Sequence, residues 1–106
     1  MKESFIQKKI LDYLDAKGCY TVKITSANKT GVADIICCYH GRFVALEVKT
    51  DKGVVSEMQQ FQISEVLKSG GNSEVVRSVE EVRQLINKLN REHDEWNFWS
   101  ERNNDI

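Results

Sequence analysis

Residues 31–50 read GVADIICCYHGRFVALEVKT. Two apolar runs in this segment, 32–38 and 43–49, are rich in Val, Ile, Cys and Phe, and they flank a short polar sequence that contains glycine. Paired apolar runs around such a sequence are typical of a β-hairpin. We therefore predict two antiparallel strands with a turn centred on His40-Gly41.

The predicted register places two carboxylates opposite each other. Residues that face each other across this hairpin have numbers that sum to 81, so Asp34 lies opposite Glu47. Directly opposed side chains of an antiparallel pair have Cβ atoms about 4.5–5.5 Å apart. Lys49 projects from the same face as Glu47, because side chains alternate along a strand. We expect an Asp, a Glu and a Lys close together on one face.

Two carboxylates held this close repel each other unless a positive charge lies between them. One explanation is a divalent cation, since Mg²⁺ and Mn²⁺ take oxygen ligands from carboxylates, water and substrate phosphate. Such a cation lowers the pKa of bound water and stabilises charge on a phosphoryl oxygen. The other explanation is a surface salt bridge, in which Lys49 neutralises one acid for less than about 1 kcal/mol. The three residues alone leave both explanations open.

A wider set of residues resembles a known family. Asp34 followed by Glu47-Val48-Lys49 matches the D…(E)-x-K signature of the PD-(D/E)xK nuclease superfamily. More narrowly, about residues 3–90 resemble a stand-alone VRR-NUC domain, in an ordered set of features: Glu3 in an opening helix, Gly18 closing it, Gly31-Val32-Ala33-Asp34, Glu47-Val48-Lys49-Thr50, Gly53, Ser56-Glu57-Met58-Gln59 and Lys68-Ser69-Gly70. One departure is Ala33, where the family usually has Pro; it removes no ligand.

The resemblance implies a metal site and its cofactor. Asp34, Glu47 and the backbone carbonyl of Val48 would hold Mg²⁺ or Mn²⁺, and Glu3 would complete the site directly or through water. Lys49 would position the attacking water, help to deprotonate it, or stabilise the pentavalent phosphate. An ammonium with a reference pKa of about 10.4 is a poor base unless it is desolvated, so the electrostatic role of Lys49 is physically easier to defend.

Gln59 has both a structural and a functional interpretation. The segment Ser56–Gln59 fits a capping box, in which the Gln side chain reaches back to the backbone N–H of the N-cap Ser. Gln59 also shares a helical face with Ile63 and Val66, at the edge of an inward-facing surface. The resemblance implies that this Gln orients water or backbone near the metal, and we favour Gln59 over Gln60 for that role.

The pattern along the chain predicts an α/β fold with the element order α-β-β-β-α-β-α. We expect helices over residues 3–17 and 56–68 and from residue 78 onward, with strands at 19–25, 32–38, 43–49 and 74–77. The resulting fold class is a small PD-(D/E)xK nuclease-like α-β-β-β-α-β core. Its mixed sheet has the hairpin at the centre and helices on both faces.

The composition is that of one ordinary globular domain. The chain has 106 residues, of which 41% are hydrophobic and 29% are charged. No apolar run approaches the ~20 residues of a transmembrane helix, and the first residues lack a secretory signal. We expect a cytoplasmic location, in the host cytoplasm if the protein is viral, and no membrane partner. We place the nuclease-like domain at 1–91 and a polar, aromatic-containing tail at 92–106.

Cysteine usage and net charge give weaker signals. Three cysteines argue against a disulfide framework, and the absence of a Cys-x-x-Cys pair argues against zinc. We expect small core residues, with Cys37 and Cys38 pointing to opposite faces of a strand, so that Cys38 alone could border the face of the predicted site. The net charge of −1 lacks the basic excess usual in nucleic-acid-binding proteins. Part of the acid lies in the tail and in the predicted site, where a cation would offset it.

These features predict a metal-dependent DNA endonuclease, which by resemblance leaves a 5′-phosphate and a 3′-hydroxyl. So small a chain has little room for a separate DNA-reading domain, so we expect selectivity for branched DNA such as four-way (Holliday) junctions. Two sites on a two-fold homodimer would suit a symmetric branched substrate. The neighbours of the hairpin and the aromatic residues at 96–99 are the candidate dimer surfaces.

Two other functions remain open. The first is a non-catalytic nucleic-acid-binding or interaction module with the same fold, in which the acids pair only with Lys49. Such a module would show little increase in melting temperature with Mg²⁺ or Mn²⁺. The second is a sequence-specific nuclease of restriction type, which would cut at a fixed recognition sequence.

Overall fold

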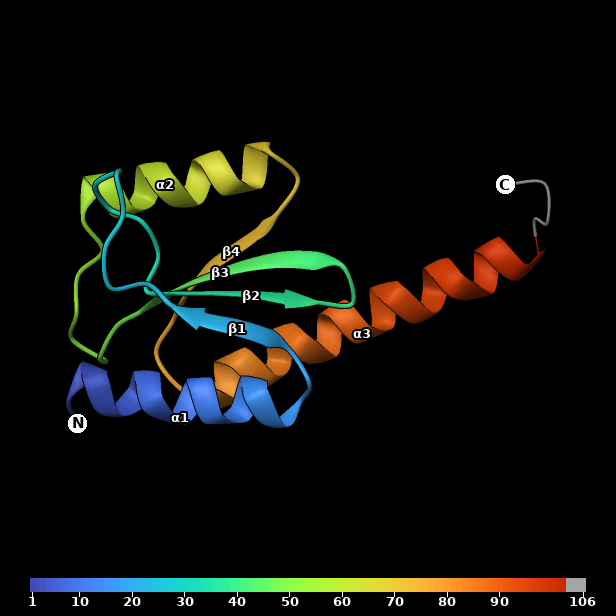
Figure 1. Cartoon of the computed structure of the whole chain (residues 1–106), viewed down its shortest axis with the longest axis horizontal. Helices are drawn as coiled ribbons and strands as arrows, with labels where there is room; N and C mark the ends of the chain where they lie inside the picture. Colours follow the sequence, from blue (N-terminus) through green and yellow to red (C-terminus); the bar gives the residue numbers. More distant parts are fainter. Residues whose placement is uncertain (103–106) are drawn as a thin grey trace.

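The computed structural model describes residues 1–102, with only the backbone described at 96–98 and 100–102. The predicted order α-β-β-β-α-β-α is confirmed (Figure 1). The elements are α1 (Glu3–Ala16), β1 (Tyr20–Lys23), β2 (Ile35–Tyr39), β3 (Arg42–Val48), α2 (Glu57–Lys68), β4 (Asn72–Val76) and α3 (Val79–Arg102).

The four strands form one mixed sheet in the order β1-β2-β3-β4, so the predicted hairpin lies at its centre. β1 and β3 both pair antiparallel with β2, whereas β4 pairs parallel with β3. Ile35 faces Leu46 and Tyr39 faces Arg42, which confirms the register in which paired numbers sum to 81. His40 and Gly41 both have positive φ, 48° and 78°, as a two-residue hairpin turn of type I′ requires.

The helices cover the two faces of the sheet unequally. α1 and α3 lie together on one face and α2 lies alone on the other (Figure 1). The apolar core lies between the sheet and the first pair of helices. It contains Ile6, Ile10 and Leu14 of α1, Val82, Leu85, Ile86 and Leu89 of α3, and Val44, Leu46 and Val48 of β3. α2 contributes no buried residue.

Local capping defines where the helices begin. The Ser56 side chain accepts a hydrogen bond from the Gln59 backbone N–H, which begins α2. The Ser78 hydroxyl accepts one from the Glu81 N–H in the same way, at 3.2 Å. The Glu81 carboxylate, however, accepts from the N–H of Arg77, at 3.2 Å, so the reciprocal contact reaches one residue further back than a capping box would place it.

The tip of the hairpin packs against the middle of α3. The Tyr39 hydroxyl donates to Asn90, Arg42 forms a 2.9 Å ion pair with Glu92, and the His40 ring stacks on His93 with centroids 4.8 Å apart. The boundary proposed at residue 91 thus falls inside a continuous helix, and the division between domain and tail stays a prediction. The side chain of Trp96 lies outside the described residues, whereas Trp99 is exposed.

The three cysteines differ in their surroundings. Cys37 and Cys38 point to opposite faces, as predicted. Cys19 and Cys37 are buried, as expected of core residues, whereas Cys38 is exposed because the strand turns its side chain away from the core. Burial raises the pKa of the Cys37 thiol to about 12. None of the helices described is long and apolar enough to cross a membrane.

Candidate active site

The predicted site residues meet at one end of the sheet. β3 ends there, and the N-termini of α1 and α2 lie at the same end, on the left of Figure 1. Asp34 directly precedes β2, and the register continued by one residue places it opposite Glu47. Its Oδ2 atom accepts a hydrogen bond from the Val48 N–H at 2.8 Å, and its backbone carbonyl accepts one from the Ile24 N–H at 2.8 Å. Asp34 is therefore held between β1 and β3.

Glu47 is the most deeply buried of the acids in this site. The residue is 2% exposed, which is rare for a carboxylate without full pairing. Its Oε1 atom accepts a hydrogen bond from the Gln59 amide, and the Lys49 Nζ lies 4.0 Å from the same oxygen. Its Oε2 atom is buried and has no hydrogen-bond partner. One oxygen of a buried acid is thus available to a further ligand.

Burial and neighbouring charge disfavour the ionised form of Glu47. Burial and the neighbouring Asp34 raise the pKa of Glu47 to about 8, and Lys49 only partly opposes them. Without a further cation, Glu47 therefore retains a proton near neutral pH, and a hydrogen bond from that proton to Asp34 contributes to the raised pKa. A divalent cation would stabilise the two ionised carboxylates in place of that proton.

Lys49 is well placed but does not neutralise Glu47 by itself. Its side chain is 14% exposed, and the 4.0 Å separation from the Glu47 oxygen is longer than a hydrogen bond. By contrast, the exposed pair Lys8–Asp12 on α1 is closed at 3.0 Å. The salt-bridge explanation therefore leaves the second oxygen of Glu47 without a partner.

Gln59 makes the predicted capping contact and a second contact with Glu47, whereas its role in orienting water stays a prediction. Its Oε1 atom accepts a hydrogen bond from the Ser56 N–H at 2.9 Å, which completes the capping box. The Nε2 atom of the same amide donates to Glu47. The cap fixes the orientation of the amide, and its remaining donor then faces the acid. A local capping motif and a contact across the fold therefore use the same side chain.

Gly31 allows the loop before β2 to approach the start of α2. Its φ is +83°, and a Cβ at this position would lie 2.6 Å from the Met58 carbonyl carbon and 2.9 Å from the Gln59 nitrogen. Any other residue would push this loop and α2 apart. Gly31 thus contributes to the contact between Gln59 and Glu47, a role that the sequence motif did not specify.

Glu3 lies near the site without joining a compact cluster. It accepts a 3.5 Å hydrogen bond from the buried Gln7 side chain, and its charge contributes to the raised pKa of Glu47. The described residues contain no group of three His, Cys, Asp or Glu side chains that could hold a metal ion. A role for Glu3 through water, and the role of the Val48 carbonyl, stay predictions.

The donors that do converge fit a hard divalent cation. They are the oxygens of Asp34 and Glu47, and Mg²⁺ commonly uses one or two carboxylates while keeping several waters. The unpartnered Oε2 atom of Glu47 agrees with this donor set. No thiol or imidazole belongs to the site, so a soft or borderline metal is not favoured.

Sequence reasoning did not single out Arg77, which reaches the loop that follows Lys49. Its guanidinium donates to the backbone carbonyls of Thr50 and Gly53. An arginine after a short strand belongs to no motif, so only the tertiary structure identifies this contact.

The fold is similar to two solved structures. One, described as "VRR_NUC domain", matches with a TM-score of 0.70 and 25% identity, over 80% of this chain and 94% of that chain. Another, described as "VRR_NUC domain protein", matches with a TM-score of 0.66 and 18% identity, over 82% and 86% of the two chains. The chain has a VRR_NUC fold. The resemblance inferred from the sequence motifs is therefore confirmed at the level of the fold.

Comparison of the amino-acid sequence with family models and curated proteins gives no match. Similarity to VRR_NUC structures nevertheless covers most of this chain and most of each matched chain. The similarity therefore supports a nuclease-like fold.

Proposed function

We propose that the protein is a Mg²⁺- or Mn²⁺-dependent endodeoxyribonuclease that hydrolyses phosphodiester bonds. The observation that carries this proposal is the buried Glu47 carboxylate, which faces Asp34 and has one unpartnered oxygen. A buried polar atom without a partner is costly, and a buried charge is more so. A cation held between these acids would remove that cost and supply the chemistry of a nuclease.

Each residue of the site has a distinct role in the proposed mechanism. Asp34, Glu47 and the Val48 carbonyl would hold the cation, with Glu3 acting through water. When bound, the cation stabilises charge on the phosphoryl oxygens and lowers the pKa of water. The Lys49 ammonium stabilises the negative charge that builds on the pentavalent phosphate, because it faces this end of the sheet and is largely desolvated.

Gln59 orients the acid in this mechanism. Its amide is held by Ser56 on one side and donates to Glu47 on the other, so this hydrogen bond restrains the Glu47 carboxylate. The Val48 N–H holds Asp34 in the same way. Both carboxylates are therefore oriented before any ligand arrives, which reduces the entropy lost on binding. The products would carry a 5′-phosphate and a 3′-hydroxyl.

We further propose branched DNA as the substrate and a homodimer as the active form. The described chain is one sheet with three helices and contains no separate DNA-reading element. Selectivity would then come from the shape of the substrate. A two-fold dimer would present two sites to the symmetric arms of a four-way junction. The neighbours of the hairpin and the 96–99 segment remain the candidate interfaces.

The first experiment measures cleavage of labelled four-way junction, flap and linear duplex DNA with Mg²⁺, Mn²⁺ or a chelator. Asp34→Asn keeps an oxygen for the Val48 N–H but removes the charge, and we expect kcat to fall by a factor of about 10³ or more. The matched control is Asp12→Asn, which removes an exposed α1 carboxylate paired with Lys8 and should leave kcat unchanged.

The same experiment tests the alternatives. If folded wild-type protein cuts no substrate with either metal, and neither metal raises its melting temperature, a non-catalytic module with the same fold is favoured. Cutting at a fixed sequence in linear duplex would instead favour a restriction-type nuclease. Sedimentation at micromolar concentration tests the dimer separately, and a monomer that still cuts would contradict the dimer without contradicting the chemistry.

A further inference from the structure

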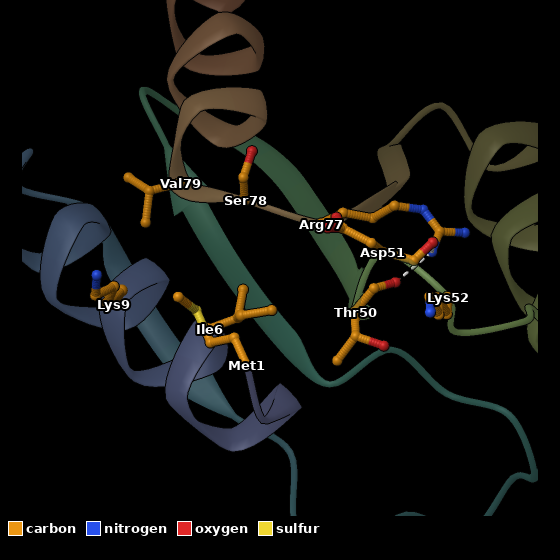
Figure 2. Close-up of a pocket in the computed structure, with 9 residues that line it drawn as sticks. All are labelled: Met1, Ile6, Lys9, Thr50, Asp51, Lys52, Arg77, Ser78 and Val79. Carbon is orange, nitrogen blue, oxygen red and sulfur yellow. Dashed lines mark hydrogen bonds between the residues drawn. The ribbon is translucent and has the colours of Figure 1, made fainter.

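Arg77 holds the loop at residues 50–53 by its backbone. Its Nη1 atom donates to the carbonyl oxygens of Thr50, of Asp51 at 3.4 Å and of Gly53 at 2.9 Å. Figure 2 shows the Arg77 side chain extending from the segment between β4 and α3 to this loop. One cationic nitrogen therefore brings together three carbonyl groups of a single turn.

The 50–53 loop is a tight turn whose carbonyl groups accept hydrogen bonds from a charged side chain. The Gly53 N–H donates to the Thr50 carbonyl at 3.0 Å, which closes the turn. A charged donor stabilises such a group of acceptors more than a neutral one would. Arg77 takes part in none of the salt bridges found among the described residues, so its charge is directed to the loop.

The loop in turn packs against Lys49. A Cβ at Gly53 would lie 3.2 Å from both Cβ and Cδ of Lys49, so the Gly53 backbone borders the lysine stem closely. The Lys49 N–H donates to the carbonyl of Val76, the residue before Arg77, at 3.0 Å. Residues 76 and 77 therefore constrain Lys49 in two ways. Val76 binds the Lys49 backbone directly, and Arg77 holds the loop whose Gly53 backbone borders the Lys49 side chain.

We propose that Arg77 is a positioning residue that holds the 50–53 loop against Lys49 and so fixes the Lys49 ammonium beside Glu47. The contribution to catalysis rests on the proposed nuclease function. The hydrogen bonds between Arg77 and the loop do not rest on that function, so their effect can be measured even if the protein cleaves no DNA.

The loop also borders open space. Together with α1 and the start of α3, it lines a cavity of about 600 Å³; Figure 2 shows Ile6, Thr50 and Val79 around it. Arg77 lines the same cavity. Among the described residues, the side-chain hydrogen bonds to the backbone of this loop all come from Arg77, so we expect the loss of this side chain to let the loop move away from Lys49.

The first test is hydrogen exchange of the backbone amides, comparing wild type with Arg77→Met. We expect the Gly53 amide to exchange at least about ten-fold faster in the variant, because its acceptor carbonyl loses the charged donor. The amide of Cys19, which bonds the Leu14 carbonyl at 3.1 Å in the α1 cap, should be unaffected. Arg83→Met is the matched control, since Arg83 lies on α3 and pairs only with Glu80 among acidic side chains of the described chain. Unchanged exchange at Gly53 would overturn the proposal.

The second test separates kcat from KM in cleavage of the preferred DNA. We expect Arg77→Met to lower kcat by about 10–100-fold with KM for DNA changed less than about two-fold, as is usual for a residue that orients a catalytic group. Arg77→Lys keeps the charge on a shorter side chain and should recover part of kcat. If Arg77 instead binds phosphate directly, KM rises, kcat is retained and the salt dependence weakens, which would overturn the proposal.

Gly53→Ala provides a second variant in case Arg77→Met does not fold. It leaves Arg77 in place and adds a methyl group 3.2 Å from the Lys49 stem, so it should lower kcat without raising KM. If the wild type shows no cleavage, the nuclease proposal fails, while the exchange test still decides the contact. If cleavage is normal in Arg77→Met although Gly53 exchanges faster, the link from the loop to Lys49 is wrong.

Discussion

The two faces of the sheet differ in what their contacts contribute. On the face covered by α1 and α3, helix residues such as Ile10 and Leu14 are completely buried against the strands. On the α2 face, no residue of the helix is buried. Two buried oxygen atoms on this face, Oε2 of Glu47 and Oγ of Ser73, have no hydrogen-bond partner. A cavity of about 60 Å³ lies beneath α2 and touches both of these residues.

The α1–α3 face therefore accounts for most of the folding stability, whereas the α2 face holds the residues of the proposed site. Apolar burial is the main source of folding free energy, and the α1–α3 face supplies most of it. The α2 face can therefore hold a buried acid and an imperfectly packed helix without unfolding the domain. Polar groups with unsatisfied bonds are found at functional sites because the rest of a fold supports them.

Truncation of the core should be far more costly on the α1–α3 face. Leu14 is 0% exposed, so Leu14→Ala should reduce the free energy of unfolding by about 2–5 kcal/mol. Phe61 of α2 is 51% exposed, and Phe61→Ala should cost less than about 1 kcal/mol. Urea denaturation of both variants measures the difference. Equal losses would show that α2 belongs to the core and would remove the contrast.

The approach of the loop before β2 to α2 should depend on Gly31. Gly31→Ala combines a positive φ with backbone atoms 2.6 Å from the new methyl group, so we expect a loss of about 2–3 kcal/mol in unfolding free energy. Gly41 has a similar φ of +78° but nothing within 4 Å, so Gly41→Ala isolates the conformational strain, about 1 kcal/mol. Similar losses in the two variants would contradict a role for the contact with α2.

The pH dependence of stability should identify Glu47 in metal-free protein. Its pKa is raised from 4.5 to about 8 in the folded state, so the folded chain binds a proton more tightly than the unfolded chain. Stability is therefore full below about pH 4.5 and falls as the pH rises toward 8. Glu47→Gln cannot ionise, and in a chelator at pH 8 it should be more stable than wild type by about 1–2 kcal/mol.

Adding Mg²⁺ sharpens this measurement. The cation should raise the melting temperature of the wild type at pH 8 and leave Glu47→Gln unchanged, because the variant lacks one anionic ligand. Equal pH profiles for the two proteins in chelator would mean that Glu47 ionises normally. The argument for a cation from its burial would then fail.

Cysteine labelling should report the two faces without perturbing stability. Cys38 is exposed, whereas Cys19 and Cys37 are buried, and burial raises the pKa of Cys37 to about 12. Since the thiolate is the reactive species, a thiol reagent should modify only Cys38 in native protein at pH 7.5. Mass spectrometry locates the adduct, and full denaturation should expose all three thiols. Rapid modification of Cys37 in native protein would contradict the burial of this strand face.

The parts of the fold that could be predicted from sequence are those set by local patterns. The two-residue turn and the alternating apolar runs determine the hairpin register, so the opposition of Asp34 and Glu47 followed directly. The Ser56–Gln59 capping box is likewise a contact across one helical turn. Alternation placed Cys37 and Cys38 on opposite faces, but it left the exposure of Cys38 open because it does not show which part of a strand face a helix covers.

Local sequence patterns specify the order of the elements, the register of the hairpin and the acids and the lysine on one strand face. The packing of the elements specifies which atoms of these side chains have partners. The Gln59 amide reaches Glu47 because the crossover helix packs beside β3, and Arg77 reaches the 50–53 loop because β4 pairs in parallel with β3. These contacts join residues far apart in the chain. Their geometry depends on how whole elements pack, which no local pattern encodes.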